Sequence, residues 1–90
     1  MDLADLKNRL ARGENLHTEF KQWPVQPDDL AATIVAFANT DGGQLFLGVD
    51  DKGEVAGIER NDQDRVSQAV DNVAYNSISP PVTVVQEPVT

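Results

Sequence analysis

The sequence predicts an α+β fold: a small mixed β-sheet of about four strands with three helices, in the order α-β-α-β-β-α-β. Apolar residues follow helical spacing in some segments and alternate as in strands in others, and Gly or Pro residues separate these segments. A chain of 90 residues with 40% apolar content suits one small domain. We therefore expect a single domain over residues 1–90.

The first half of the chain is expected to hold two helices with a strand between them. The first helix begins after Asp2, a suitable N-cap, and ends before Gly13. Its apolar stripe consists of Leu3, Leu6 and Leu10. Alternation over residues 16–21 predicts a half-buried strand that turns Leu16, Thr18 and Phe20 to one side. Residues 30–39 follow Pro27 and are nearly all apolar, which predicts a helix buried on most sides.

The second half is expected to hold a hairpin, a helix and a last strand. The apolar run 44–49 predicts a central strand, and residues 50–53 form a turn that leads to a partner strand over 54–58. A helix capped near Asn61 or Asp62 reaches about residue 78. A final strand over 82–85 has no successor with which to pair, so we expect the chain to be truncated near its C-terminal end and to be part of a longer protein.

Charge and motifs exclude several classes of function. The formal charge of −8 argues against indiscriminate binding to polyanions, and the absence of cysteine excludes disulfide scaffolds and thiolate zinc sites. The sequence contains no P-loop motif, so ATPase activity is not expected. His17 is the only histidine and is predicted to be an ordinary surface residue. No apolar run is long enough to span a bilayer, and a cytoplasmic location with no membrane partner is the default.

A few basic residues and one glycine pair are the candidates for phosphate contacts. If Arg9, Arg12 and Lys21 converge, they form a local phosphate-binding patch on an acidic background; the alternative is a solvated helix face. Gly42 and Gly43 join a helix to a strand, where exposed backbone amides can receive a phosphate oxygen. The structural alternative is that the abrupt reversal itself requires two glycines.

Acidic residues gather around the predicted sheet, namely Glu14, Glu19, Asp50, Asp51 and Glu54. Three converging carboxylates would form a site for Mg²⁺ or Mn²⁺. Glu14 and Glu19 are an odd number of residues apart, so a regular strand would direct them to opposite faces. They can converge only if Glu14 lies in the turn after Gly13.

Three motifs in series resemble those of the Schlafen AlbA-type domain. They are ENLHTEFK over residues 14–21, IVAFANTDGG over 34–43 and LFLGVDD over 45–51, and Gly53, Gly57 and residues 79–81 continue the similarity. Bacterial members of that family are commonly described as DNA-binding or transcriptional regulator domains, and they often stand at the N-terminus of RecG-related helicase proteins. The resemblance implies a nucleic-acid-binding module whose partners are DNA or structured RNA, downstream domains of the same chain and a possible second copy.

The resemblance also implies a catalytic alternative. In animal Schlafen proteins the domain carries three acidic residues that cleave structured RNA with a divalent metal, and motif matching places them on Glu14, Glu19 and Asp51. Those enzymes present two lobes that form a basic horseshoe, whereas this chain supplies one acidic lobe. Three hypotheses follow: a nucleic-acid-binding regulatory module, a metal-dependent nuclease, or an oligomerisation domain.

Overall fold

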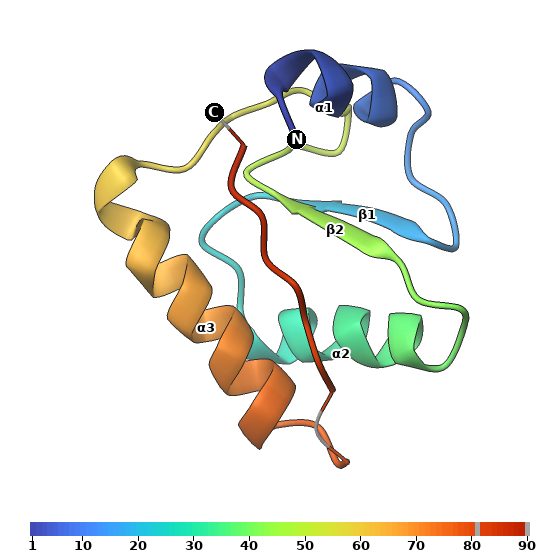
Figure 1. The fold of residues 1–90 in the computed structure, drawn as a ribbon, viewed down its shortest axis with the longest axis vertical. Helices are drawn as coiled ribbons and strands as arrows, with labels where there is room; N and C mark the ends of the chain where they lie inside the picture. Colours follow the sequence, from blue (N-terminus) through green and yellow to red (C-terminus); the bar gives the residue numbers. More distant parts are fainter. Residues whose placement is uncertain (81, 90) are drawn as a thin grey trace.

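A two-stranded parallel sheet lies between one helix on one face and two helices on the other (Figure 1). The computed structural model describes residues 1–80 and 82–89. Within them the elements are α1 (Leu3–Leu10), β1 (Thr18–Lys21), α2 (Pro27–Ala38), β2 (Gln44–Leu47), the 3₁₀ helix η1 (Arg60–Asp62) and α3 (Gln63–Asn76). The α+β class and the three α-helices predicted from the sequence are confirmed.

Helix α1 is fixed at both ends by the residues that the sequence indicated. The Asp2 carboxylate accepts a hydrogen bond from the amide of Asp5 at 2.8 Å, which satisfies one of the unpaired donors of the first turn. After the helix, Gly13 adopts a φ of 76° and its amide donates to the carbonyl of Leu10 at 3.0 Å. Residues with a side chain rarely adopt this conformation, so glycine is suited to turn the chain here, two residues after the C-cap Ala11.

The two strands run parallel because α2 carries the chain back across the sheet. Thr18 pairs with Gln44 and Phe20 pairs with Phe46. Side chains alternate between the faces of a sheet, so these four residues face α1. The intervening pairs, in which Glu19 opposes Leu45 and Lys21 opposes Leu47, face α2 and α3.

Each face of the sheet has its own hydrophobic cluster. On the α1 face the buried residues are Leu6, Leu10, Phe20 and Val49, and Phe46 packs against them. On the other face they are Leu30, Ile34, Val70 and Val73, with Leu45 and Leu47 packed against them from β2. The sheet is therefore the layer that joins two small cores.

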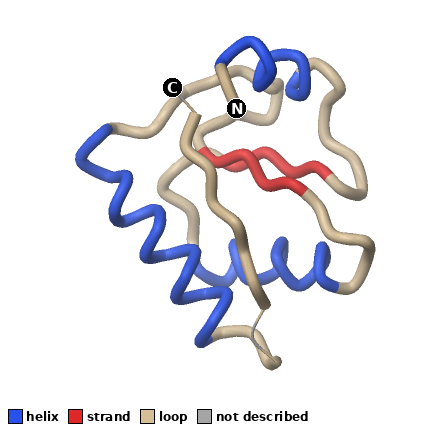
Figure 2. The backbone as a smooth tube through the Cα atoms, in the orientation of Figure 1, coloured by secondary structure: helices blue, strands red, loops and turns tan. Residues whose placement is uncertain are grey.

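Residues 82–89 return from the end of α3 to α1 as an extended segment (Figures 1 and 2). The amide of Val82 donates to the carbonyl of Ala74 at 3.2 Å, and the Gln86 side chain donates to the Asp71 carboxylate at 2.9 Å. At the far end the Met1 ammonium pairs with Glu87. This hydrogen bond raises the pKa of the Met1 amino group and lowers the pKa of the Glu87 carboxyl. The segment thus connects α3 to α1.

The prediction of about four strands is not confirmed in the described part of the chain, where the sheet has two. Instead of a partner strand over 54–58, a single bridge joins Val49 to Val55. Gly57 follows with a φ of 83°, and both Ala56 and Gly57 donate to the carbonyl of Gly48, so the backbone turns away after one pair. Residues 82–85 are extended but belong to no strand, and β2 is consequently an edge strand and not a central one.

The prediction that the apolar helix would be buried on most sides is also wrong. In α2 only Leu30, Thr33 and Ile34 are buried, whereas Val35 and several alanines remain exposed. Within the described residues, β2 and α3 pack against one side of α2 and leave its other side exposed. No helix in the described residues has the length and apolar character needed to cross a membrane.

Leu30→Ala tests whether the α2–α3 cluster carries the stability of the fold. Leu30 is 1% exposed, so the truncation leaves a cavity and we expect the free energy of unfolding to fall by about 2–5 kcal/mol. Urea denaturation followed by circular dichroism measures this change. The matched control is Leu16→Ala, because Leu16 is 71% exposed and its loss should cost about 0.5 kcal/mol or less. Equal effects of the two substitutions would contradict this assignment of the core.

Candidate nucleic-acid interface

Two adjoining hollows open on the α1 side of the sheet. The larger, which we call the α1 groove, has a volume of about 590 Å³ and lies between α1, the loop after it and the first residues of β1 and β2. The smaller, the glycine hollow, has a volume of about 430 Å³ and lies around Gly42 and Gly43. His17, Thr18 and Gln44 line both, so the two hollows form one continuous surface.

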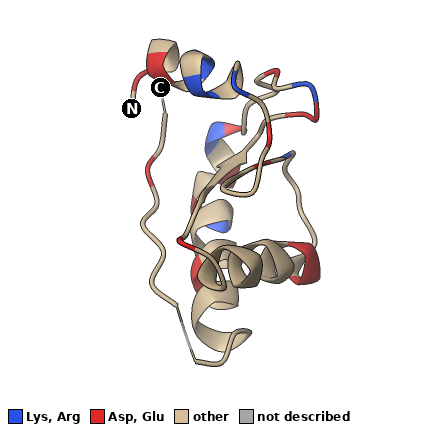
Figure 3. Cartoon of the chain, turned by 90° about the vertical axis from the view of Figure 1, so that its right-hand side faces the viewer, with Lys and Arg blue, Asp and Glu red and all other residues tan. Residues whose placement is uncertain are grey.

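Helix α1 contributes Asp5, Asn8 and Arg9 to the α1 groove, and the turn that follows the helix adds Arg12. These positions follow the spacing i, i+3, i+4 and i+7, beside the buried stripe that contains Leu6 and Leu10. Figure 3 shows the acidic positions at the start of α1 and the basic ones toward its end, where the helix dipole favours cations. Two arginines against one aspartate give this groove a positive formal charge on a chain whose total is −8.

The glycine hollow is built on a sharp reversal between α2 and β2. Gly42 has a φ of 96° and its amide donates to the carbonyl of Phe37 at 3.1 Å. A side chain on Gly43 would lie 2.5 Å from the ring of Phe37, so only glycine fits without a shift. The amide of Gly43 has no acceptor within residues 1–80 and 82–89 and lies at the surface. Both glycines therefore have a structural role, and the Gly43 amide is in addition an available donor.

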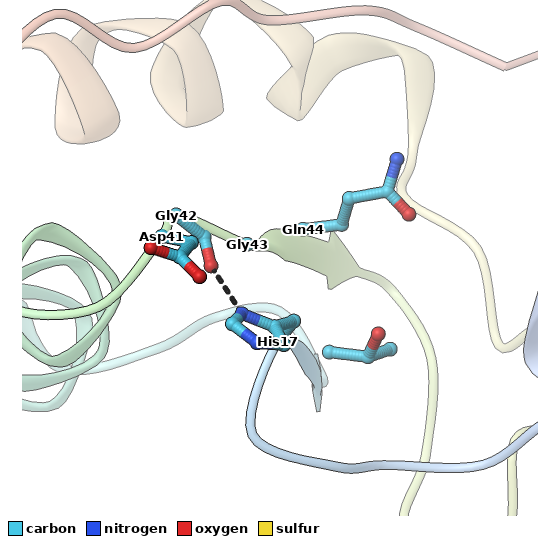
Figure 4. Close-up of a pocket in the computed structure, with 6 residues that line it drawn as sticks. His17, Asp41, Gly42, Gly43 and Gln44 are labelled. Atoms are coloured by element: carbon cyan, nitrogen blue, oxygen red, sulfur yellow. Dashed lines mark hydrogen bonds between the residues drawn. The ribbon is translucent and has the colours of Figure 1, made fainter.

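His17 connects the two hollows, a role that the sequence analysis missed when it treated this residue as an ordinary surface histidine. Its Nδ1 lies 2.8 Å from the carbonyl oxygen of Gly42 (Figure 4). A carbonyl oxygen only accepts, so Nδ1 carries the proton in this contact. The His17 carbonyl accepts from the amide of Gln44 at 2.8 Å. The sequence signal for this role is weak, because it requires knowing that β1 and β2 begin side by side.

The structure brings four of the five predicted nucleic-acid-binding residues to this surface. Arg9 and Arg12 line the α1 groove, and Gly42 and Gly43 line the glycine hollow. Lys21 does not line either hollow, because it opposes Leu47 on the face of the sheet that α2 and α3 cover. Its Nζ lies 3.7 Å from Oε1 of Glu19. The alternation of side chains along β1 separates it from the arginines.

The three carboxylates of the predicted metal site have different surroundings. Glu14 lies before β1 and accepts a hydrogen bond from the amide of Phe20 at 3.2 Å. Glu19 points to the α2 face and pairs with Lys21. Asp51 is exposed in the turn after β2, next to Asp50, whose carboxylate accepts from the amides of Lys52 and Glu54. Within the described residues, no group of three or more His, Cys, Asp or Glu side chains is arranged to hold a metal ion.

Comparison with protein-family models identifies the family of this chain. The model described as Schlafen, AlbA_2 matches residues 14–90, which is most of the chain. The match includes β1, both glycines of the glycine hollow and the turn that carries Asp51, but it begins after Arg12. No solved structure matches this chain.

Replacing His17 tests whether its ring holds the Gly42–Gly43 reversal. His17→Ala removes the contact with the Gly42 carbonyl but keeps the backbone bond from Gln44 to residue 17. Loss of one exposed hydrogen bond, worth about 1 kcal/mol, should increase exchange of the Gly42 amide, which is bonded to the Phe37 carbonyl, roughly fivefold. Two-dimensional NMR measures this exchange. His17→Gln, which restores a side-chain donor, should recover part of the protection, and unchanged exchange in His17→Ala would contradict the proposed contact.

Proposed function

Because this chain belongs to the Schlafen AlbA_2 family, we propose that it binds nucleic acid along the surface formed by the α1 groove and the glycine hollow. Arg9 and Arg12 contact phosphates at one end of this surface, and the Gly43 amide is a neutral donor at the other. His17 lies between them and sets the position of the glycine reversal.

The observation that carries this proposal is the continuity of the two hollows through His17, Thr18 and Gln44. Either end alone has an ordinary explanation, since basic residues suit a helix C-terminus and glycines suit a reversal. The fold does not require the α1 groove and the glycine hollow to be continuous. It offers phosphate-binding groups at both ends on an otherwise acidic molecule.

Two arginines on a chain of charge −8 predict weak, salt-sensitive binding by this domain alone. A second copy or further segments of a longer protein would supply additional contacts. Proteins of the transcriptional-regulator or RecG-related type would provide such a setting, in which this domain is the N-terminal binding module. DNA and structured RNA are both candidate ligands for this surface.

A metal-dependent nuclease is the second candidate, and one contact favours it. A side chain on Gly53 would lie 3.3 Å from the carbonyl oxygen of Leu10 and 3.5 Å from the ring of Phe20. The turn that carries Asp51 therefore packs beside the end of α1, close to the segment that leads to Glu14. Glu19 would have to join them from the other face of β1. With all three acids together, Mg²⁺ or Mn²⁺ would stabilise negative charge on a phosphodiester.

Charge reversal at Arg12 tests the binding proposal. Arg12 is exposed, so Arg12→Glu should leave the fold intact while it weakens binding to a labelled oligonucleotide about tenfold near 50 mM salt. The slope of log affinity against log salt should become smaller by roughly one. Fluorescence anisotropy at several salt concentrations measures both quantities.

Arg65→Glu is the matched control, because it makes the same change in net charge at an exposed position of α3. We expect it to have a clearly smaller effect than Arg12→Glu, and Lys21→Gln should also have a small effect because Lys21 lies on the other face of the sheet. Equal losses in Arg12→Glu and Arg65→Glu would show that total charge, not the α1 groove, determines affinity.

Addition of Mn²⁺ tests the nuclease candidate. If Glu14, Glu19 and Asp51 form one site, paramagnetic broadening should appear at all three residues together at low Mn²⁺ concentration, and Asp51→Asn should abolish it. Glu54→Gln in the same turn is the control and should leave the broadening unchanged. Broadening confined to scattered exposed acids, with no cleavage of a structured RNA, would contradict the candidate.

A further inference from the structure

The floor of the α1 groove contains an aromatic ring that phosphate binding does not need. Phe46 lines the groove from β2 and is only half-buried. Its ring centroid lies 6.2 Å from that of Phe20, with the planes tilted by 58°, so Phe20 holds one side of the ring. Aromatic rings at the surface of nucleic-acid-binding grooves stack on bases whatever their sequence.

Three amide side chains line the same groove, and each comes from a different element. Asn8 lies on α1, Asn15 in the loop before β1, and Gln44 at the start of β2. The Asn15 oxygen already accepts from the amide of His17 at 2.8 Å, which leaves its NH₂ group as a donor. Amide groups pair with the edges of bases through one donor and one acceptor. The groove thus combines a stacking surface with groups that recognise base edges.

We infer that the α1 groove binds one unstacked base of a single-stranded nucleic acid, with the phosphates that flank it held by Arg9 and Arg12. This inference rests on the proposed function and specifies its ligand. The groove volume of about 590 Å³ lies within the usual range for pockets that enclose a small molecule, and a nucleotide is of that class. Asp5 at the same groove opposes phosphate entry at the start of α1 and favours the end near Arg12.

A duplex is a poorer ligand for this groove. Bases in a duplex are stacked on both sides and paired along the edges that Asn8 and Gln44 would contact, so they reach Phe46 only after being turned out of the helix. A duplex also presents two lines of phosphates, which need a long basic surface. This chain offers two arginines in the groove on a total charge of −8.

The test compares three probes, each prepared as DNA and as RNA: a single-stranded hexanucleotide, the same strand with an abasic residue at its centre, and a longer hairpin whose stem pairs that hexanucleotide with its complement. The intact strand should bind about tenfold more tightly than the abasic strand, the loss expected for one stacked base, and more tightly than the duplex. In NMR titrations the Phe46 ring protons should shift with the intact strand and not with the abasic one. Because DNA and RNA present the same kinds of base, the affinities for the DNA and RNA forms of the intact strand show which of the two nucleic acids the groove prefers.

Asn8→Ala and Gln44→Ala are suitable variants because both residues are exposed and their loss leaves the core intact. Each should weaken binding of the intact strand several-fold and leave binding of the abasic strand unchanged, whereas Gln68→Ala on α3, also exposed, should change neither. Equal affinity for intact and abasic strands, in both DNA and RNA, overturns the inference. If Arg12→Glu still weakens every probe in that case, the proposed function stands; if no probe binds at low salt, both fail.

Discussion

The pairing of β1 with β2 is the constraint on which the rest of this structure depends. It is a pairing of four residues on each strand, and it places the start of both strands at the same end of the molecule. The bond from the Gln44 amide to the His17 carbonyl begins the ladder, and directly beside it the His17 ring reaches Gly42. The register of this pairing therefore determines which side chains enter each of the two hydrophobic clusters. It also places the α1 groove next to the glycine hollow.

The same register separates charged residues that lie close together in the sequence. Phe20 and Thr18 face α1, whereas Glu19 and Lys21 face α2 and pair with each other. The carbonyl of His17, just before β1, accepts from Gln44, and the carbonyl of Lys21 accepts from Gly48, just after β2. The amide of Phe20 therefore points to the other edge of β1. Glu14 accepts a hydrogen bond from that amide. In this structure Glu14 thus protects an exposed strand edge, a use of carboxylates that requires no metal.

Local signals in the sequence were sufficient for the helices and turns. Asp2, Gly13 and Pro27 mark element ends by chemistry that acts within a few residues, and each stands where it was predicted. The number of strands could not be predicted in this way, because residues 54–58 have strand-like composition but the backbone turns away after the Val49–Val55 bridge. The exposed side of α2 was missed for a related reason: apolar composition does not reveal which other elements pack against a helix.

In the candidate site, too, spacing along the chain predicts some of the residues, whereas the others come together only through the pairing of the strands. Arg9 follows Asn8 on α1 and Arg12 lies in the turn just after the helix, so their proximity could be predicted from spacing along the chain alone. Phe46 could be assigned to a strand, but its place in the floor of the groove follows only once β2 lies beneath α1. His17 and Gly42 are distant in sequence and meet because a crossover helix returns the chain to its starting edge. An acidic chain can in this way present a small surface that is neutral in formal charge, since Arg9 and Arg12 balance Asp5 and Asp41 there while most carboxylates lie outside it.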